Sequence, residues 1–185
     1  MAGGASERPA EMGRQAVDLL GIRGIMGILP HRYPFLMVDK LLELEPDRRA
    51  RGIKNVTINE PYFLGHFPGN PVLPGVMLLE SMAQIGGMVF GRGHGSVLLQ
   101  GMDRVRFEQF VLPGDTLEIE AECVRVLSRG GMVKATASVN GKRVARAHIT
   151  FVFLPEEAKA SINGKRSPRT GLNGPRVVTL STPPS

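Results

Sequence analysis

The sequence contains no tryptophan, a single cysteine and few aromatic residues, which make up 5% of its 185 positions. One cysteine cannot form a disulfide within the chain, so a reducing compartment is the simplest expectation. Cys123 stands at an apolar position of an alternating segment, which favours a buried structural residue over a nucleophile. Cys and His are also absent at metal-ligand spacing, so we expect no bound metal and no cofactor.

Long apolar runs are absent as well, and none reaches the roughly eighteen residues that a membrane span needs. Residues 1–20 carry acidic side chains and lack a continuous apolar stretch, which argues against a secretory signal or transit peptide. We therefore expect a cytoplasmic protein that does not associate with membranes. The length suits one domain whose core is aliphatic, with nine methionines.

Acidic residues are outnumbered by basic ones, and the net charge is +6 with a pI of about 10.0. Such a balance indicates either a solvated basic surface or an acidic partner such as nucleic acid, a membrane or an acidic protein. Residues 155–185 carry five basic and two acidic side chains, so this tail supplies half of the net charge. The remainder is only modestly basic, which weakens the interpretation as a nucleic-acid-binding protein.

Composition divides the chain into a polar lead (residues 1–20), a patterned domain (21–154) and a tail rich in Pro, Gly and Ser (155–185), which we expect to be disordered. A short helix is possible over Glu11–Leu20. Asn140-Gly141 favours a hairpin between the last two strands. Six segments are predicted as strands from their apolar alternation and the turns between them: 35–44, 51–58, 97–102, 115–127, 132–139 and 142–153.

One helix is predicted over residues 75–90, after a loop stiffened by four prolines. From Val76 to Phe90 its polar residues are Glu80, Ser81 and Gln84, and it has no Lys or Arg. A helix that is apolar on all sides is a buried helix. The sequence therefore predicts an α+β fold in which an antiparallel sheet wraps around one central helix.

Glu80 is the most informative residue of this helix, because an unpaired buried carboxylate is costly. It must have a partner, be protonated or line a wet cavity, and Gln84 one turn later could orient it or a water molecule. A structural role, such as a pair with a nearby strand, is about as well supported as a catalytic one by the buried position alone.

His66 lies in the proline-pinned loop that leads into the helix, within the stretch Gly65 to Pro71. Histidine exchanges a proton near neutral pH, which suits a general base. The N–H groups of Gly75 and Val76 open the helix and are free to polarise a carbonyl oxygen. One segment thus offers a base, an acid and an oxyanion donor, the set required to abstract a proton beside a thioester and expel a β-hydroxyl.

The stretch Gly65 to Gln84, GHFPGNPVLPGVMLLESMAQ, resembles the FabZ-type 3-hydroxyacyl-[acyl-carrier-protein] dehydratases. Further similar stretches are Leu29 to Asp39, Ile53 to Pro61 and Val111 to Asp115, so the resemblance spans about residues 25–154. It implies a hot-dog fold and the conversion of (3R)-hydroxyacyl-[acyl-carrier-protein] to the trans-2-enoyl product in type II fatty acid synthesis.

The resemblance also implies roles for individual residues. His66 of one subunit would take the C2 proton, Glu80 of the other would help the C3 hydroxyl leave, and Gln84 would hold the acid or its water. Gly75, with Val76, would donate to the thioester carbonyl. The substrate tunnel would involve Tyr62, Phe63 and Met77, with core packing as an equally supported alternative for the two aromatic residues. The implied partners are an acidic acyl carrier protein and a second copy, in a homodimer assembled as a trimer of dimers.

Four other functions compete with this one. A hot-dog thioesterase would need water to attack the thioester carbonyl, and the pairing of His66 with Glu80 argues against it. A dehydratase/isomerase resembles the family but carries Asp at the acid position. A nucleic-acid-binding module gives no reason for an acid in an apolar helix. An inactive acyl-binding homologue is disfavoured because both site residues are present. Lys54, Arg104 and Arg106 are candidates for the carrier contact, with plain solvated charge as the alternative.

Overall fold

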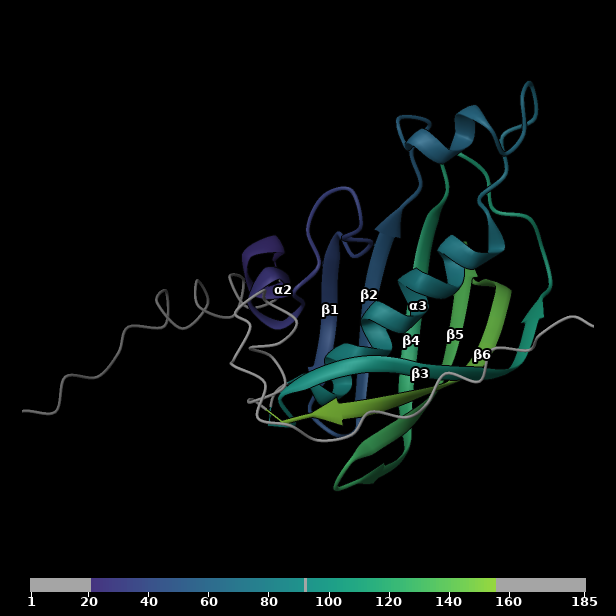
Figure 1. Ribbon diagram of the computed structural model, residues 1–185. Coiled ribbons are helices and arrows are strands. Elements are labelled where there is room, and N and C mark those ends of the chain that lie inside the picture. Colours follow the sequence, from purple (N-terminus) through teal and green to yellow (C-terminus); the bar gives the residue numbers. More distant parts are fainter. Residues whose placement is uncertain (1–20, 92, 156–185) are drawn as a thin grey trace, which may run out of the picture.

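The computed structural model describes residues 21–91 and 93–155, which form one sheet and two α-helices (Figure 1). In this part of the chain, six antiparallel strands lie in the order β1-β2-β4-β5-β6-β3. The predicted α+β arrangement is confirmed. The elements are α2 (Ile22–Ile28), β1 (Lys40–Glu45), β2 (Arg49–Asn55), the 3-10 helix η1 (Pro61–Leu64), α3 (Gly75–Phe90), β3 (Ser96–Phe107), β4 (Thr116–Leu127), β5 (Gly130–Val139) and β6 (Lys142–Leu154).

The sheet curls around α3, which packs against all six of these strands (Figure 1). The helix is buried without interruption from Ser81 to Phe90, as its composition predicts. Its first turn is different, because Val76 is 71% exposed. The alternation expected of β4 is also present: Leu117 and Ile119 face the helix, while the intervening Glu118 is exposed.

Small residues set how closely α3 approaches the sheet. A Cβ at Gly86 would lie 2.9 Å from Val133 Cγ2 in β5. A Cβ at Gly131, the second residue of β5, would lie 2.6 Å from the ring of Phe90. Both positions therefore exclude a side chain, and the helix lies closer to the strands than alanine would allow.

The segment before β1 differs from the prediction. Residues 35–44 were expected to form one strand, but β1 begins only at Lys40. Met37 donates its N–H to the side-chain oxygen of Gln84, and the carbonyl of Phe35 accepts from the same amide. The backbone groups that a neighbouring strand would bind are thus taken by a side chain of α3, which explains why these apolar residues do not extend the sheet.

The remaining boundaries follow from local chemistry. Helix α2 was not predicted, because its seven residues include Gly24 and Gly27, which disfavour helices. Strand β3 extends to Phe107, five residues beyond the predicted end. The helix considered for Glu11–Leu20, the polar lead and residues 156–185 lie outside the described residues, so the proposed domain limits stay a prediction. No helix in residues 21–91 and 93–155 is long and apolar enough to cross a membrane.

Candidate active site

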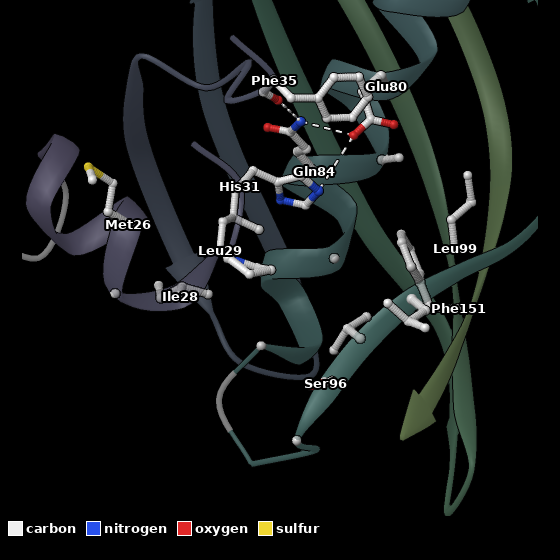
Figure 2. Close-up of a pocket in the computed structure, with 18 residues that line it drawn as sticks. Met26, Ile28, Leu29, His31, Phe35, Glu80, Gln84, Ser96, Leu99 and Phe151 are labelled. Atoms are coloured by element: carbon white, nitrogen blue, oxygen red, sulfur yellow. Dashed lines mark hydrogen bonds and ion pairs between the residues drawn. The ribbon is translucent and has the colours of Figure 1, made fainter. Parts of the chain in front are cut away.

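A cavity of about 510 Å³ lies between α3, β3 and the segment that follows α2. Most of its walls are apolar and include Ile28, Leu29, Leu99 and Phe151. Figure 2 shows that three polar side chains, those of His31, Glu80 and Gln84, lie together and face one another. The cavity therefore combines an apolar chamber with one polar group of residues, an arrangement typical of small-molecule sites.

Glu80 lies in the second turn of α3 and is held by Gln84 in the third. Nε2 of Gln84 donates to Oε1 of Glu80 at 2.9 Å, as the one-turn spacing suggested. The same Nε2 donates to the Phe35 carbonyl at 2.7 Å, while Oε1 of Gln84 accepts the Met37 N–H at 2.8 Å. Gln84 is 2% exposed, so this network fixes the acid from a buried position.

His66 lies after η1 in a compact loop. Its N–H and that of Gly65 donate to the Tyr62 carbonyl, and Phe67 and Asn70 bond to each other across a turn. Gly69 has φ of +74° in this turn, a conformation that glycine adopts without strain. The imidazole Nδ1 lies 2.7 Å from the carbonyl oxygen of Val72. Because a carbonyl only accepts, Nδ1 carries the hydrogen and Nε2 of the neutral ring is left as the basic atom.

The two predicted reacting groups are not brought together in one chain. His66 is not among the described residues that line the cavity containing Glu80. The sequence resemblance places these residues on different subunits, so that each site would combine groups from two copies.

The start of α3 has the form expected of an oxyanion donor. Met77 and Leu78 donate to the carbonyl of Pro74, so the N–H groups of Gly75 and Val76 precede the first intrahelical hydrogen bonds. The ring of Phe107 covers Gly75, since a Cβ there would lie 2.8 Å from Phe107 Cζ. A side chain at position 75 would therefore displace the ring of Phe107, the last residue of β3.

The three residues predicted for the tunnel pack with the core instead of lining the described cavity. Phe63 is buried, while Tyr62 and Met77 are partly buried against the core cluster. The cavity follows the face of α3 that carries Ala83 and Gly87. A contact between these three residues and substrate stays a prediction.

Tyr62 has a further property. Its hydroxyl is buried and has no hydrogen-bond partner among the described residues. Burial raises the pKa of this phenol well above its usual range, and the charges of Glu60 and Asp39 raise it further. Tyr62 is therefore neutral at any physiological pH and does not act as a base.

The basic residues suggested for a carrier contact differ in exposure. Lys54 is only 6% exposed, and its ammonium group pairs with Glu60 at 2.5 Å. Because its charge is buried and paired with Glu60, Lys54 is not available to a partner at the surface. The prediction of a carrier contact at Lys54 is therefore wrong. Arg104 and Arg106 are exposed on β3 and remain accessible.

His31 is the site residue that sequence reasoning missed. Its Nε2 lies 3.7 Å from Oε1 of Glu80, although 49 positions separate the two residues. The position of His31 between two prolines, within one of the stretches that carry the family resemblance, was the feature that could have identified it. No group of three or more His, Cys, Asp or Glu residues in the described ranges could hold a metal ion.

Comparison with known proteins places these observations in a family. Residues 29–148 match the FabA-like domain. The chain is 48% identical over 137 residues to the 3-hydroxyacyl-[acyl-carrier-protein] dehydratase FabZ of Caldicellulosiruptor saccharolyticus, covering 71% of this chain and 97% of the relative. It is 49% identical over 139 residues to the corresponding Enterococcus faecalis enzyme, covering 72% and 98%.

Among solved structures, the ApeI:P dehydratase heterocomplex of Xenorhabdus doucetiae aligns with a TM-score of 0.63 at 18% identity, over 76% of this chain and 97% of the other. This similarity supports the fold alone, and the predicted hot-dog fold is confirmed. The sequence match extends further, because it includes the loop of His66 and the helix of Glu80 and Gln84. The chain therefore belongs to the FabA-like family and, within it, to the FabZ-type 3-hydroxyacyl-[acyl-carrier-protein] dehydratases.

Proposed function

We propose that this protein dehydrates (3R)-hydroxyacyl-[acyl-carrier-protein] to the trans-2-enoyl thioester in type II fatty acid synthesis, with His66 and Glu80 as the reacting pair. The observation that carries the proposal is the carboxyl group of Glu80, which Gln84 holds at the polar end of an otherwise apolar cavity. Such a cavity accommodates an acyl chain and presents an acid to its polar end.

The reaction moves one proton from carbon and one to oxygen. Nε2 of His66 takes the C2 proton, and the electron pair shifts toward the thioester carbonyl. The N–H groups of Gly75 and Val76, at the positive end of α3, stabilise the negative charge on the carbonyl oxygen. The pair then forms the C2–C3 double bond as the C3 hydroxyl leaves with a proton from Glu80, which releases water.

The fixed tautomer of His66 supports its role as base. With Nδ1 bound to the Val72 carbonyl, the ring cannot turn without breaking a 2.7 Å hydrogen bond. The lone pair of Nε2 therefore keeps one direction. A base with a fixed orientation requires less reorganisation when substrate binds.

A second copy of the chain would complete the site. Strand β3 lies at one end of the sheet, so one of its edges has no strand neighbour among the described residues. Its twelve residues include the exposed Leu98 and Leu99, and Leu99 also lines the cavity of Glu80. A long exposed edge of this kind favours pairing with another strand. Pairing across β3 would place the partner's surface beside the cavity, where the partner's loop could supply its base.

The same proposal includes an acidic acyl carrier protein as the substrate carrier, further assembly into a trimer of dimers, and a cytoplasmic location. Arg104 and Arg106 are exposed on β3 and offer positive charge to such a carrier.

The first test follows the absorbance of a trans-2-enoyl thioester linked to carrier protein, with products identified by mass. Wild type should consume the enoyl band by hydration, while His66→Ala and Glu80→Gln should each be slower by about a hundredfold to ten-thousandfold. An unchanged band with the folded wild type would overturn the proposal. Release of free acid would favour a thioesterase, and a shifted double bond would favour the isomerising type.

The two-copy site has its own test. His66→Ala and Glu80→Gln are mixed under conditions that allow subunit exchange. In a mixed dimer one of the two sites contains both native residues, so the mixture should regain about a quarter of the wild-type activity. Failure to regain activity, with exchange verified by native mass spectrometry, would place both residues in a site within one subunit.

A further inference from the structure

His31 faces the proposed acid, and it has no role in the reaction described above. Its Nε2 lies 3.7 Å from Oε1 of Glu80 (Figure 2). The two side chains are shielded, with 31% and 20% of their surface exposed. Both residues also line the cavity. A contact at this distance is longer than a hydrogen bond, but it is within the range of direct electrostatic attraction.

The backbone that carries His31 is fixed independently of Glu80. The Arg32 guanidinium donates to the carbonyl oxygens of Leu29 at 2.9 Å, His31 at 2.7 Å and Met26 at 3.1 Å. The imidazole also stacks beside the ring of Phe35, with 6.0 Å between centroids. The ring is thus placed by its own segment, so its position opposite the carboxyl group is a property of the fold.

Gln84 determines which oxygen of Glu80 is held. The Met37 N–H can only donate, so the side-chain oxygen of Gln84 must face it and the NH₂ group must face Glu80. Both hydrogens of this group are then used, one for Glu80 and one for the Phe35 carbonyl. Oε1 of Glu80 is therefore an acceptor, and any proton on the carboxyl group is on Oε2.

The hydrogen on His31 follows from its other nitrogen. Nδ1 is buried and has no hydrogen-bond partner in the described part of the chain. A hydrogen on Nδ1 would have no acceptor among the described residues, whereas Nε2 faces an oxygen of Glu80, which accepts. The neutral ring therefore carries its hydrogen on Nε2, the atom that faces Oε1 of Glu80. His31 becomes a second donor directed at the oxygen that Gln84 already holds.

We propose that His31 is a positioning residue, which acts with Gln84 to keep Oε1 of Glu80 as an acceptor and leave Oε2 to exchange a proton with the substrate hydroxyl. This inference rests on the proposed function of Glu80. Oε1 accepts the hydrogen bond from Gln84 and faces the N–H of His31 at 3.7 Å, so a half-turn that moves a protonated oxygen into its place would lose the hydrogen bond and the attraction together. The proton therefore stays on the oxygen directed at the substrate.

The test compares two variants of similar size in the full-length protein. His31→Gln keeps an amide donor at about the reach of Nε2, whereas His31→Leu removes it. In the enoyl thioester assay, kcat of His31→Leu should fall about tenfold to a hundredfold, with KM changed by less than about twofold. His31→Gln should recover most of this loss. His148→Gln is the histidine control, because His148 alternates with the buried Ala147 and Ile149 and so faces away from α3.

The outcomes separate this inference from the proposed function. An inactive wild type overturns the dehydratase proposal, whereas an active wild type with an unchanged His31→Leu overturns only the role of His31. A rise in KM alone would mean that the ring contacts substrate, and an equal loss of kcat in the Leu and Gln variants would mean that the N–H donor at position 31 is irrelevant. Either result would overturn the positioning role.

If His31→Leu does not fold, as judged by thermal unfolding, His31→Asn replaces it. Its amide stops at the reach of Nδ1, so its kcat should fall while that of His31→Gln does not.

Discussion

At the scale of single residues, the acid is supported by one amide that uses nearly all of its hydrogen-bonding groups. Gln84 bonds to Glu80, to the Phe35 carbonyl and to the Met37 N–H. No charged side chain could satisfy the same three partners, because two of them accept and one donates. The site therefore depends on an amide at position 84.

Gln84→Glu tests this dependence with almost no change in shape. The new carboxyl group would place an acceptor against the Phe35 carbonyl and against Glu80, so both contacts become repulsive. We expect a loss of about 1–3 kcal/mol in the free energy of unfolding and a fall in kcat of at least about tenfold. Denaturant unfolding and the enoyl thioester assay measure the two effects. Gln84→Glu with unchanged stability would show that the buried network contributes little.

Cys123 provides a second residue-scale prediction. Burial raises the pKa of its thiol, with a further contribution from Asp47. A raised pKa lowers the thiolate fraction at any given pH below it, and the thiolate is the reactive form. The folded protein should therefore react with a chromogenic disulfide reagent more slowly than glutathione does at pH 8, and denaturant should remove the difference. Cys123→Ser should keep full activity. A large loss of activity in a variant whose thermal unfolding is unchanged would contradict a purely structural role.

Part of the site could be predicted at this scale from local spacing. Glu80 and Gln84 are one helical turn apart, so their contact follows from the helix alone. His31 meets Glu80 only because the segment after α2 packs against α3, and no periodic pattern encodes that approach. The pairing of His66 with Glu80 likewise follows from no spacing along the sequence, because this contact is proposed to lie between two copies of the chain.

At the scale of elements, alternation predicted the strands well where one face is buried and the other is exposed, as in β4. It failed at residues 35–38, where Met37 and Val38 are buried by packing while the backbone of Phe35 and Met37 bonds to Gln84. It also missed α2, whose glycines weaken the helix propensity and whose one fully buried side chain is Ile25. Tertiary contacts decide the structure in both places.

The packing of α3 gives an element-scale prediction from two adjacent glycines. A Cβ at Gly86 would meet Val133 Cγ2 at 2.9 Å, whereas one at Gly87 would meet its nearest neighbour, Phe151, at an ordinary 3.6 Å. Both alanine variants gain helix propensity, by up to about 1 kcal/mol. Gly86→Ala should nevertheless be destabilised because overpacking costs about 1–3 kcal/mol.

Gly87→Ala is the matched control and should be as stable as wild type or more so. Thermal unfolding of both variants at equal protein concentration measures the difference. Equal stability of the two variants would show that β5 can retreat from the helix and that close packing at Gly86 is not required.

At the scale of the whole molecule, one buried apolar cluster joins the elements of the described part of the chain. The buried cluster runs from Ile25 to Phe153, and the family match covers residues 29–148. A chain of residues 21–155 should therefore fold, with a melting temperature within about 4 °C of the full-length protein. Its kcat on a small enoyl thioester should be unchanged. A large fall in melting temperature would show that the flanking segments contribute to the core.

The separation of His66 from the cavity of Glu80 has a consequence for how activity depends on amount. Under the proposed two-copy site, an isolated chain holds a base without its acid and an acid without its base. At concentrations below the dissociation constant of the dimer, the number of complete sites grows with the square of the protein concentration. Dilution would then lower the activity per chain by separating the subunits, while each chain stays folded. A substitution along the edge of β3 would likewise look like a catalytic defect in a dilute assay and vanish in a concentrated one.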